Sequence, residues 1–129
     1  GSMFNTPPVF PIYMVGKVLK WMRDVGGIDV IERMANEKAA DLYQSIDNSE
    51  GFYRCPVEED SRSVMNVVFR LPSEDLEKIF ISEASEAGLL NLKGHRSVGG
   101  IRASIYNAMP ADGVRALTDF MAAFKSSHS

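Results

Sequence analysis

Residues 6–25 predict a helix that is apolar around almost its whole circumference. Most positions of this stretch carry large hydrophobic side chains: Val9, Phe10, Ile12, Tyr13, Met14, Val15, Val18, Leu19, Trp21 and Met22. A helix of this kind is normally buried on more than one side. Because the chain has only 129 residues, it can cover only part of this surface itself.

Prolines and glycines set the expected ends of this first helix. Thr6 is a suitable N-cap and Pro7 a suitable first helical residue. Pro11 lies one turn further in and has no backbone N–H to donate, so we expect a kinked or late start near Ile12. The Gly26-Gly27 pair should end the helix or form a hinge.

The rest of the chain predicts three more helices and several short strands. The helices are expected at 28–47, at 73–88 and from 110 onward, and the strands at 52–57, 64–71 and 101–106, with a short edge segment at 89–92. This order predicts an α+β fold: a small, mainly antiparallel sheet with helices packed on one face, preceded by the long apolar helix. Residues 125–129 should fray.

Periodic apolar positions predict which faces form the core. The expected helical stripes are Ile31, Met34, Ala35, Ala39, Leu42, Tyr43 and Ile46, then Leu76, Ile79, Phe80 and Ala84, and finally Val114, Leu117, Met121 and Phe124. In strand 64–71, the expected inner face is Met65, Val67, Phe69 and Leu71. Ser73 is placed to cap the third helix.

The composition argues against several classes of protein. Cys55 is the single cysteine, so no disulfide framework is possible and a reducing compartment, the cytoplasm, is expected. One cysteine and two histidines make a metal site improbable. A net charge of −3 argues against nucleic-acid binding. No apolar run reaches the roughly 18–20 residues of a membrane span.

The charged residues are unevenly distributed. No carboxylate occurs between Glu86 and Asp112, whereas this interval contains Lys93, His95, Arg96 and Arg102. Its formal charge is therefore +3, and the rest of the chain carries −6. Such an interval is a candidate site for an anionic ligand.

Glycines at 94, 99 and 100 lie among these basic residues and would let backbone N–H groups approach an anion. In the predicted strand 101–106, Arg102 faces away from the apolar side chains and projects from a rigid element beside the loop. An ordinary solvated basic loop would give the same pattern, so both interpretations stand on the residues alone. Cys55 is most simply a structural thiol. No catalytic constellation is complete.

Four segments resemble the phosphoserine aminotransferase family. They are the opening F-N-T-P-P of residues 4–8, G-F-Y-R-C-P-V of 51–57, M-N-V-V-F-R of 65–70 and K-G-H-R-S-V-G-G-I-R-A-S-I-Y-N of 93–107. The resemblance runs in order from residue 3 to residue 125. It implies the C-terminal part, including the small domain, of a pyridoxal-phosphate enzyme of fold type I and class V.

The resemblance implies a reaction and its participants. The family transfers an amino group between glutamate and 3-phosphohydroxypyruvate, giving phosphoserine and 2-oxoglutarate, in serine biosynthesis and, in many bacteria, pyridoxine biosynthesis. It implies pyridoxal 5'-phosphate as cofactor, with the chain's own large domain and a second identical subunit as partners.

The same resemblance implies roles for particular residues. Asn5 and Thr6 would bind the cofactor phosphate in the partner subunit's site. His95 and Arg96 would hold the substrate phosphate, and Arg102 the α-carboxylate. The family's Schiff-base lysine, aspartate and stacking tryptophan lie upstream, so no catalytic residue is expected here and the chain alone should be inactive.

We therefore expect four parts: an expression scar at 1–2, a segment and helix linking to a large domain at 3–27, a small domain at 28–125 and a frayed tail at 126–129. We expect the chain to be a piece of a longer protein. Two other hypotheses remain: a free-standing module that binds small anions, and a dimerisation module, both without catalysis.

Overall fold

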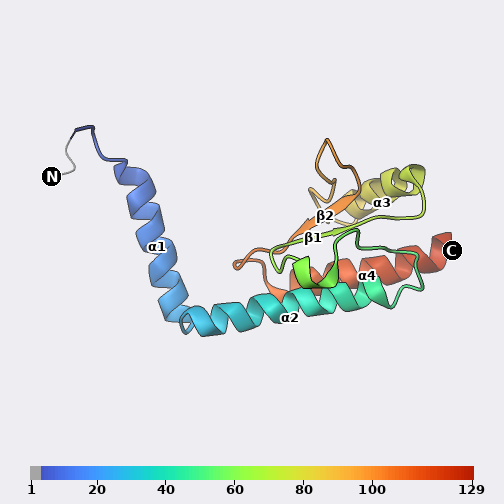
Figure 1. The fold of residues 1–129 in the computed structure, drawn as a ribbon, viewed down its shortest axis with the longest axis horizontal. Helices are drawn as coiled ribbons and strands as arrows, with labels where there is room; N and C mark the ends of the chain where they lie inside the picture. Colours follow the sequence, from blue (N-terminus) through green and yellow to red (C-terminus); the bar gives the residue numbers. More distant parts are fainter. Residues whose placement is uncertain (1–3) are drawn as a thin grey trace. The chain divides into compact units, whose positions relative to one another are not determined.

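A computed structural model describes residues 4–129, so the expected scar lies outside the described residues. Figure 1 shows the elements: α1 (Val9–Val25), α2 (Ile28–Asp47), the 3-10 helix η1 (Glu59–Ser61), β1 (Asn66–Phe69), α3 (Glu74–Glu86), β2 (Ile101–Ser104) and α4 (Ala111–His128). The chain divides into two compact units, residues 1–34 and 35–129. None of the helices within 4–129 combines the length and apolar character needed to cross a bilayer.

Helix α1 begins at Val9, so the expected start near Ile12 is wrong, as is the expected cap by Thr6. Pro8 is the N-cap residue and makes no side-chain cap bond. Pro11 is tolerated because it falls in the first turn, where backbone N–H groups have no partner within the helix. The predicted end is confirmed: Gly26 caps the helix with φ of 124°.

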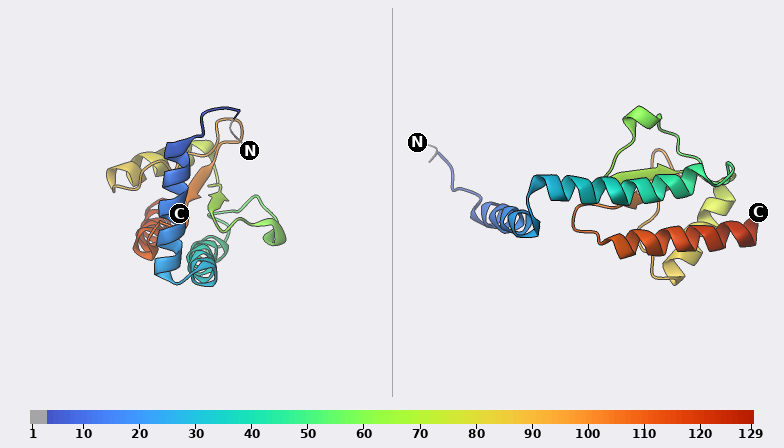
Figure 2. Two further views of the ribbon diagram at one scale, coloured as in Figure 1. Left: turned by 90° about the vertical axis from the view of Figure 1, so that its left-hand side faces the viewer. Right: turned by 90° about the horizontal axis from the view of Figure 1, so that it is seen from below.

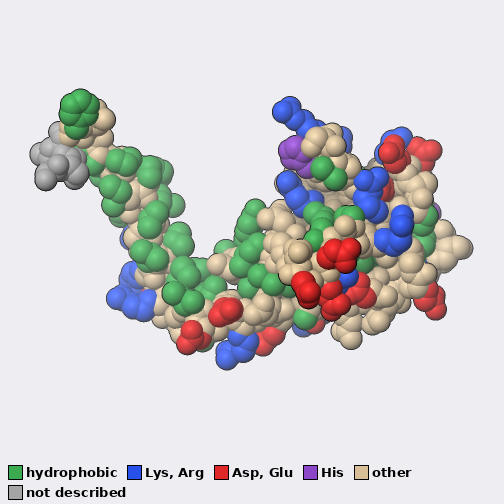
Figure 3. Space-filling model, viewed as in Figure 1, with side chains coloured by type: hydrophobic (Ala, Val, Ile, Leu, Met, Phe, Trp, Pro, Cys, Tyr) green, Lys and Arg blue, Asp and Glu red, His purple; other side chains and the backbone are tan. Residues whose placement is uncertain are grey.

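The apolar surface of α1 is exposed. No residue of this helix is buried, and Phe10 keeps 71% of its surface exposed. Figure 3 shows hydrophobic side chains along the length of α1. The sequence-based expectation that this chain covers only part of the helix is therefore confirmed.

The second unit is built on a two-stranded antiparallel sheet. Val67 pairs with Ala103, and Phe69 with Ile101. The predicted strand at 52–57 is wrong, because that segment contributes one isolated bridge, between Arg54 and Arg70. Pro56 follows two residues after the bridge and has no N–H with which to extend a ladder.

Helices cover one face of this sheet, as predicted, and Figure 2 gives two further views of the arrangement. The buried cluster joins α2, β1, α3, β2 and α4 through Ala39, Leu42, Ile46, Val67, Phe69, Phe80, Ala84, Ile101, Ala103, Val114, Leu117, Met121 and Phe124. All four residues predicted for α4 are buried. The prediction that Ile79 of α3 belongs to the core is wrong, because 42% of its surface is exposed. Glu77 is buried instead.

Side-chain contacts stabilise the start of α3 and the end of α4. The predicted cap of α3 is confirmed, since the Ser73 hydroxyl accepts a hydrogen bond from the Leu76 N–H at 3.2 Å. Helix α4 continues to His128, through the residues expected to fray. The His128 ring stacks on Phe124 with centroids 4.1 Å apart, and its Nε2 lies 3.5 Å from a Glu83 carboxylate oxygen.

A buried lysine fixes the connection between β2 and α4. The Nζ of Lys38, from α2, donates to the backbone oxygens of Ile105 at 3.1 Å, Tyr106 at 2.7 Å and Met109 at 2.8 Å. Burial lowers the pKa of Lys38. These three bonds hold the end of β2 against α2.

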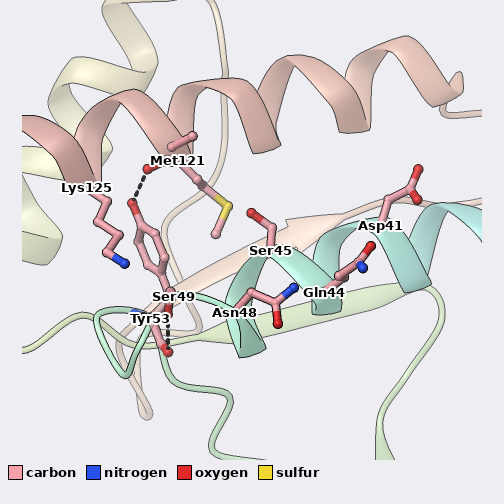
Figure 4. A pocket seen from close by; sticks show the side chains of 9 residues that line it. Asp41, Gln44, Ser45, Asn48, Ser49, Tyr53, Met121 and Lys125 are labelled. Carbon is pink, nitrogen blue, oxygen red and sulfur yellow. Dashed lines mark hydrogen bonds between the residues drawn. The ribbon is translucent and has the colours of Figure 1, made fainter.

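Tyr53 ties the loop after α2 to α4. Its hydroxyl donates to the Met121 backbone oxygen at 2.9 Å, and its backbone bonds the Ser49 hydroxyl at 2.8 and 3.0 Å. Figure 4 shows Tyr53 with Met121 and Ser49 in a pocket that Lys125 also lines. Burial raises the pKa of Tyr53 well above its ordinary value.

The raised pKa of Tyr53 predicts a loss of stability at alkaline pH. Above the ordinary tyrosine pKa of 10.0, the unfolded chain releases a proton that the folded chain retains. The free energy of unfolding should then fall by up to about 1.4 kcal/mol for each pH unit. Urea unfolding from pH 8 to 11 should show a smaller fall for Tyr53→Phe than for wild type. The exposed Tyr13→Phe is the control, and equal falls in all three proteins would refute this account.

Candidate functional site

The basic loop at residues 94–100 closes on itself before β2. The Gly94 N–H donates to the Gly100 oxygen at 2.8 Å, and the Val98 and Gly99 N–H groups donate to the His95 oxygen at 3.0 and 2.8 Å. A bridge between Lys93 and Ile101 joins the two ends of the loop. The loop is thus a compact turn anchored on the sheet.

Two glycines are required by this turn. A Cβ atom at Gly94 would collide with the backbone oxygen of Gly99. Gly100 has φ of 73°, and a Cβ there would lie 2.6 Å from Cδ of Arg70. Their position among basic residues predicted that these glycines let backbone N–H groups approach an anion, whereas in the structure they allow the backbone of the loop to close.

Gly94→Ala should therefore displace the loop. Forcing an extra methyl group into a packed site typically costs about 1–3 kcal/mol. Urea unfolding should show that loss, and the amide resonances of residues 94–102 should shift. Gly16→Ala is the control, because a Cβ at Gly16 meets nothing within 4 Å. Unchanged stability and resonances in Gly94→Ala would contradict the geometry.

The side chain of His95 is oriented by its own loop. Its Nδ1 lies 2.7 Å from the Ser97 hydroxyl and accepts the Ser97 N–H at 3.3 Å. The ring proton of a neutral His95 therefore belongs on Nε2, where it can be donated to a ligand. His95 and Arg96 are both exposed.

Arg102 occupies the position on β2 that the strand alternation predicts. Ile101 and Ala103 are buried on the core side, while Arg102 is half-buried on the other side. Its backbone N–H donates to the Leu92 oxygen at 2.8 Å. The Nε of Arg102 is buried and makes no hydrogen bond to a protein group.

A cavity of about 360 Å³ brings His95 and Arg102 together. Arg70, Val98 and Val68 are among its other lining residues. Arg96 belongs to the same loop but does not line this cavity. A planar guanidinium and a neighbouring imidazole suit a ligand with two anionic groups, one of them a carboxylate or phosphate.

Arg70 is a residue of this site that the sequence alone did not predict. The alternation of strand 64–71 already placed Arg70 opposite the apolar face, on the side that Arg102 takes in β2. The pairing of the two strands was the missing information. Among residues 4–129, no three His, Cys, Asp or Glu side chains gather as metal ligands would.

Asn5 and Thr6 lie in the first unit, in the segment before α1, and both are exposed. Their amide and hydroxyl groups can donate hydrogen bonds to phosphate oxygens. Pro7 and Pro8, which follow, have no backbone N–H to add. Side-chain donors are therefore the contribution this segment can make to a phosphate group.

The aminotransferase class-V family profile matches residues 1–117. The chain belongs to this family. Among similar proteins, the phosphoserine aminotransferase of Laribacter hongkongensis is 61% identical over 127 residues, which are 98% of this chain and 35% of that protein. The phosphoserine aminotransferase of Rhodopirellula baltica is 57% identical over 129 residues, covering 99% of this chain and 34% of that protein.

Solved structures of this class-V aminotransferase's relatives have the same fold. A phosphoserine aminotransferase from Bacillus circulans subsp. alkalophilus is 52% identical, with a TM-score of 0.95, over 99% of this chain and 36% of that one. A pyridoxal-phosphate-bound phosphoserine aminotransferase from Trichomonas vaginalis is 38% identical, with a TM-score of 0.86, over 93% of this chain and 34% of that one. The chain spans about a third of the length of these relatives.

Proposed function

We propose that this class-V aminotransferase chain is the C-terminal part of a phosphoserine aminotransferase. The whole enzyme would move the amino group of glutamate to 3-phosphohydroxypyruvate, giving 2-oxoglutarate and phosphoserine. This reaction serves serine biosynthesis and, in many bacteria, pyridoxine biosynthesis. The observation that carries the proposal is the high sequence identity to phosphoserine aminotransferases over nearly the whole chain, and the cavity that Arg102 and His95 both line fits it.

Each basic group has a separate task in this proposal. Arg102 grips the α-carboxylate of the substrate with its planar fork, from the rigid strand β2. His95 and Arg96 bind the phosphate from the loop. With the carboxylate and the phosphate held at two points, the carbon between them is held in one orientation toward the reacting groups.

Asn5 and Thr6 are the residues that would hold the phosphate of pyridoxal 5'-phosphate, in the site of a second identical subunit. Their exposed donor groups fit such a role. When bound, the cofactor supplies the aldehyde and the electron sink through which the amino group is transferred. The chain's own large domain would supply the lysine, aspartate and tryptophan of the family, so the 129-residue chain alone should not catalyse transamination.

We place the whole enzyme in the cytoplasm, since the one cysteine of this chain, Cys55, needs no oxidising compartment. Cys55 is half-buried, and its chain neighbours Arg54 and Pro56 are exposed. Nothing in the proposed reaction uses it.

An assay of the whole protein that contains this chain tests the proposal. With glutamate and 3-phosphohydroxypyruvate, 2-oxoglutarate should form in a pyridoxal-phosphate-dependent manner. With 3-hydroxypyruvate, which lacks the phosphate, kcat/KM should be much lower because the loop has no phosphate to bind. Equal use of the two oxoacids, or no transamination, would reject the proposal.

A further inference from the structure

We propose that Arg70 is a positioning residue that fixes the basic loop, residues 94–100, in its ligand-binding conformation. It would act through the backbone of Val98 rather than through contact with the ligand. Glu77 holds Arg70 in place. The effect expected on enzyme kinetics rests on the proposed function. The direct test requires only that the loop binds phosphate.

Arg70 contacts both a buried carboxylate and the loop. Its Nε donates to Oε1 of Glu77 at 2.6 Å, and its Nη1 donates to the backbone oxygen of Val98 at 2.9 Å. The side chain of Glu77 is 8% exposed and that of Arg70 is 31% exposed. One guanidinium therefore joins helix α3 to the centre of the loop.

Both supports of this link are rigid. The backbone of Arg70 exchanges two hydrogen bonds with Arg54, at 2.8 and 3.0 Å, directly after β1. Glu77 lies in the first turn of α3, where its N–H donates to the Ser73 oxygen at 3.1 Å. Oε1 of Glu77 also lies 3.4 Å from the Leu71 nitrogen, which donates to it. Because β1 and α3 are fixed, the basic loop is the part whose position the Arg70 side chain can set.

The loop is shaped to lie against the Arg70 side chain. A Cβ at Gly99 would lie 3.5 Å from Nη1 of Arg70, and a Cβ at Gly100 would lie 2.6 Å from its Cδ. Both glycines have positive φ, 74° and 73°. A side chain at Gly100 would thus separate the loop from Arg70.

The charges around the cavity support a positioning role over a binding role. Glu77 neutralises Arg70, and the bonds to Glu77 and Val98 occupy two of the nitrogens of its guanidinium. Arg102 and His95 line the same cavity, and Nε2 of His95 remains for a ligand because only its Nδ1 bonds within the loop. Arg70 and Arg54 stand directly opposite each other in the bridge, and like charges in such a pair repel unless a carboxylate offsets them.

The test compares variants of Arg70 in the 129-residue chain and in the whole enzyme. Arg70→Met alone would leave the buried Glu77 carboxylate unpaired and endanger folding. The double variant Arg70→Met/Glu77→Gln removes both charges and keeps an acceptor for Leu71. In Arg70→Lys, a single ammonium group replaces the guanidinium that donates to both Glu77 and Val98. The exposed Arg54→Lys is the matched control.

The readout on the chain is a titration with inorganic phosphate at constant ionic strength, followed by the amide resonances of residues 94–102. Both Arg70 variants should bind phosphate about 10-fold more weakly than wild type, the effect of losing one charge-assisted hydrogen bond. Arg54→Lys should bind as wild type does. If the double variant unfolds, Arg70→Lys decides the outcome.

In the whole enzyme, the KM for 3-phosphohydroxypyruvate should rise about 10-fold in Arg70→Lys while kcat changes less than about twofold. A merely structural role would lower the amount of active enzyme and leave KM unchanged. Folded variants with wild-type phosphate binding would overturn the inference, as would a wild-type chain in which phosphate leaves residues 94–102 unaffected. The two proposals can fail separately. If phosphate binding depends on Arg70 but the whole enzyme has no transaminase activity, the proposed function is rejected and the positioning role of Arg70 is retained.

Discussion

Arg102→Lys in the whole enzyme should lower kcat/KM for 3-phosphohydroxypyruvate roughly 10- to 150-fold, the equivalent of about 1.5–3 kcal/mol for a charge-assisted hydrogen bond. The charge is conserved in this variant, but a planar fork that can grip a carboxylate at two atoms becomes a single ammonium group.

Steady-state kinetics of Arg102→Lys beside Arg54→Lys separates this role from a general effect of losing an arginine. Arg54 is exposed and does not line the cavity with Arg102, so its variant should keep wild-type kcat/KM. An unimpaired Arg102→Lys enzyme would show that Arg102 does not hold the substrate carboxylate.

The isolated 129-residue chain should self-associate through α1. Phe10, Val15 and Leu19 keep 71%, 57% and 59% of their surfaces exposed. Together with their apolar neighbours they form a patch of several hundred Å², which is at or beyond the largest that soluble monomers usually expose. Light scattering should therefore show dimers or larger species at high concentration.

Charged substitutions in α1 provide the control for this expectation. The variant Val15→Glu/Leu19→Glu interrupts the apolar surface and should return the chain to the monomer. It should leave the unfolding of residues 35–129 unchanged, because that unit has its own core. A wild-type chain that stays strictly monomeric at high concentration would contradict the account of α1.

Helical periodicity predicted α2 to the residue, because the stripe of Ala35, Ala39 and Leu42 is uninterrupted and a glycine pair precedes it. The start of α1 was misplaced because Pro11 was read as an interior proline, whereas the helix begins early enough to place it in the first turn. The strand at 52–57 failed for a different reason: apolar composition does not show whether a ladder partner exists.

The location of the candidate site was predictable, because charge and glycine content mark residues 93–102 in the sequence alone. The link from Glu77 through Arg70 to Val98 was not, since it joins the ends of β1, α3 and a loop that are distant in the chain. Ile79 was assigned to the core because the apolar pattern of α3 does not reveal that a carboxylate takes the buried place. The three oxygens that bind Lys38 are equally nonlocal.

The most direct test of the central claim, that the basic loop recognises the substrate phosphate, is the specificity of Arg96→Gln in the whole enzyme. The quantity to measure is kcat/KM for 3-phosphohydroxypyruvate divided by kcat/KM for glutamate, which has no phosphate. Loss of one charge-assisted contact should lower this ratio roughly 10- to 150-fold relative to wild type. A variant with the wild-type ratio, whatever its absolute rates, would show that the loop does not recognise the substrate phosphate.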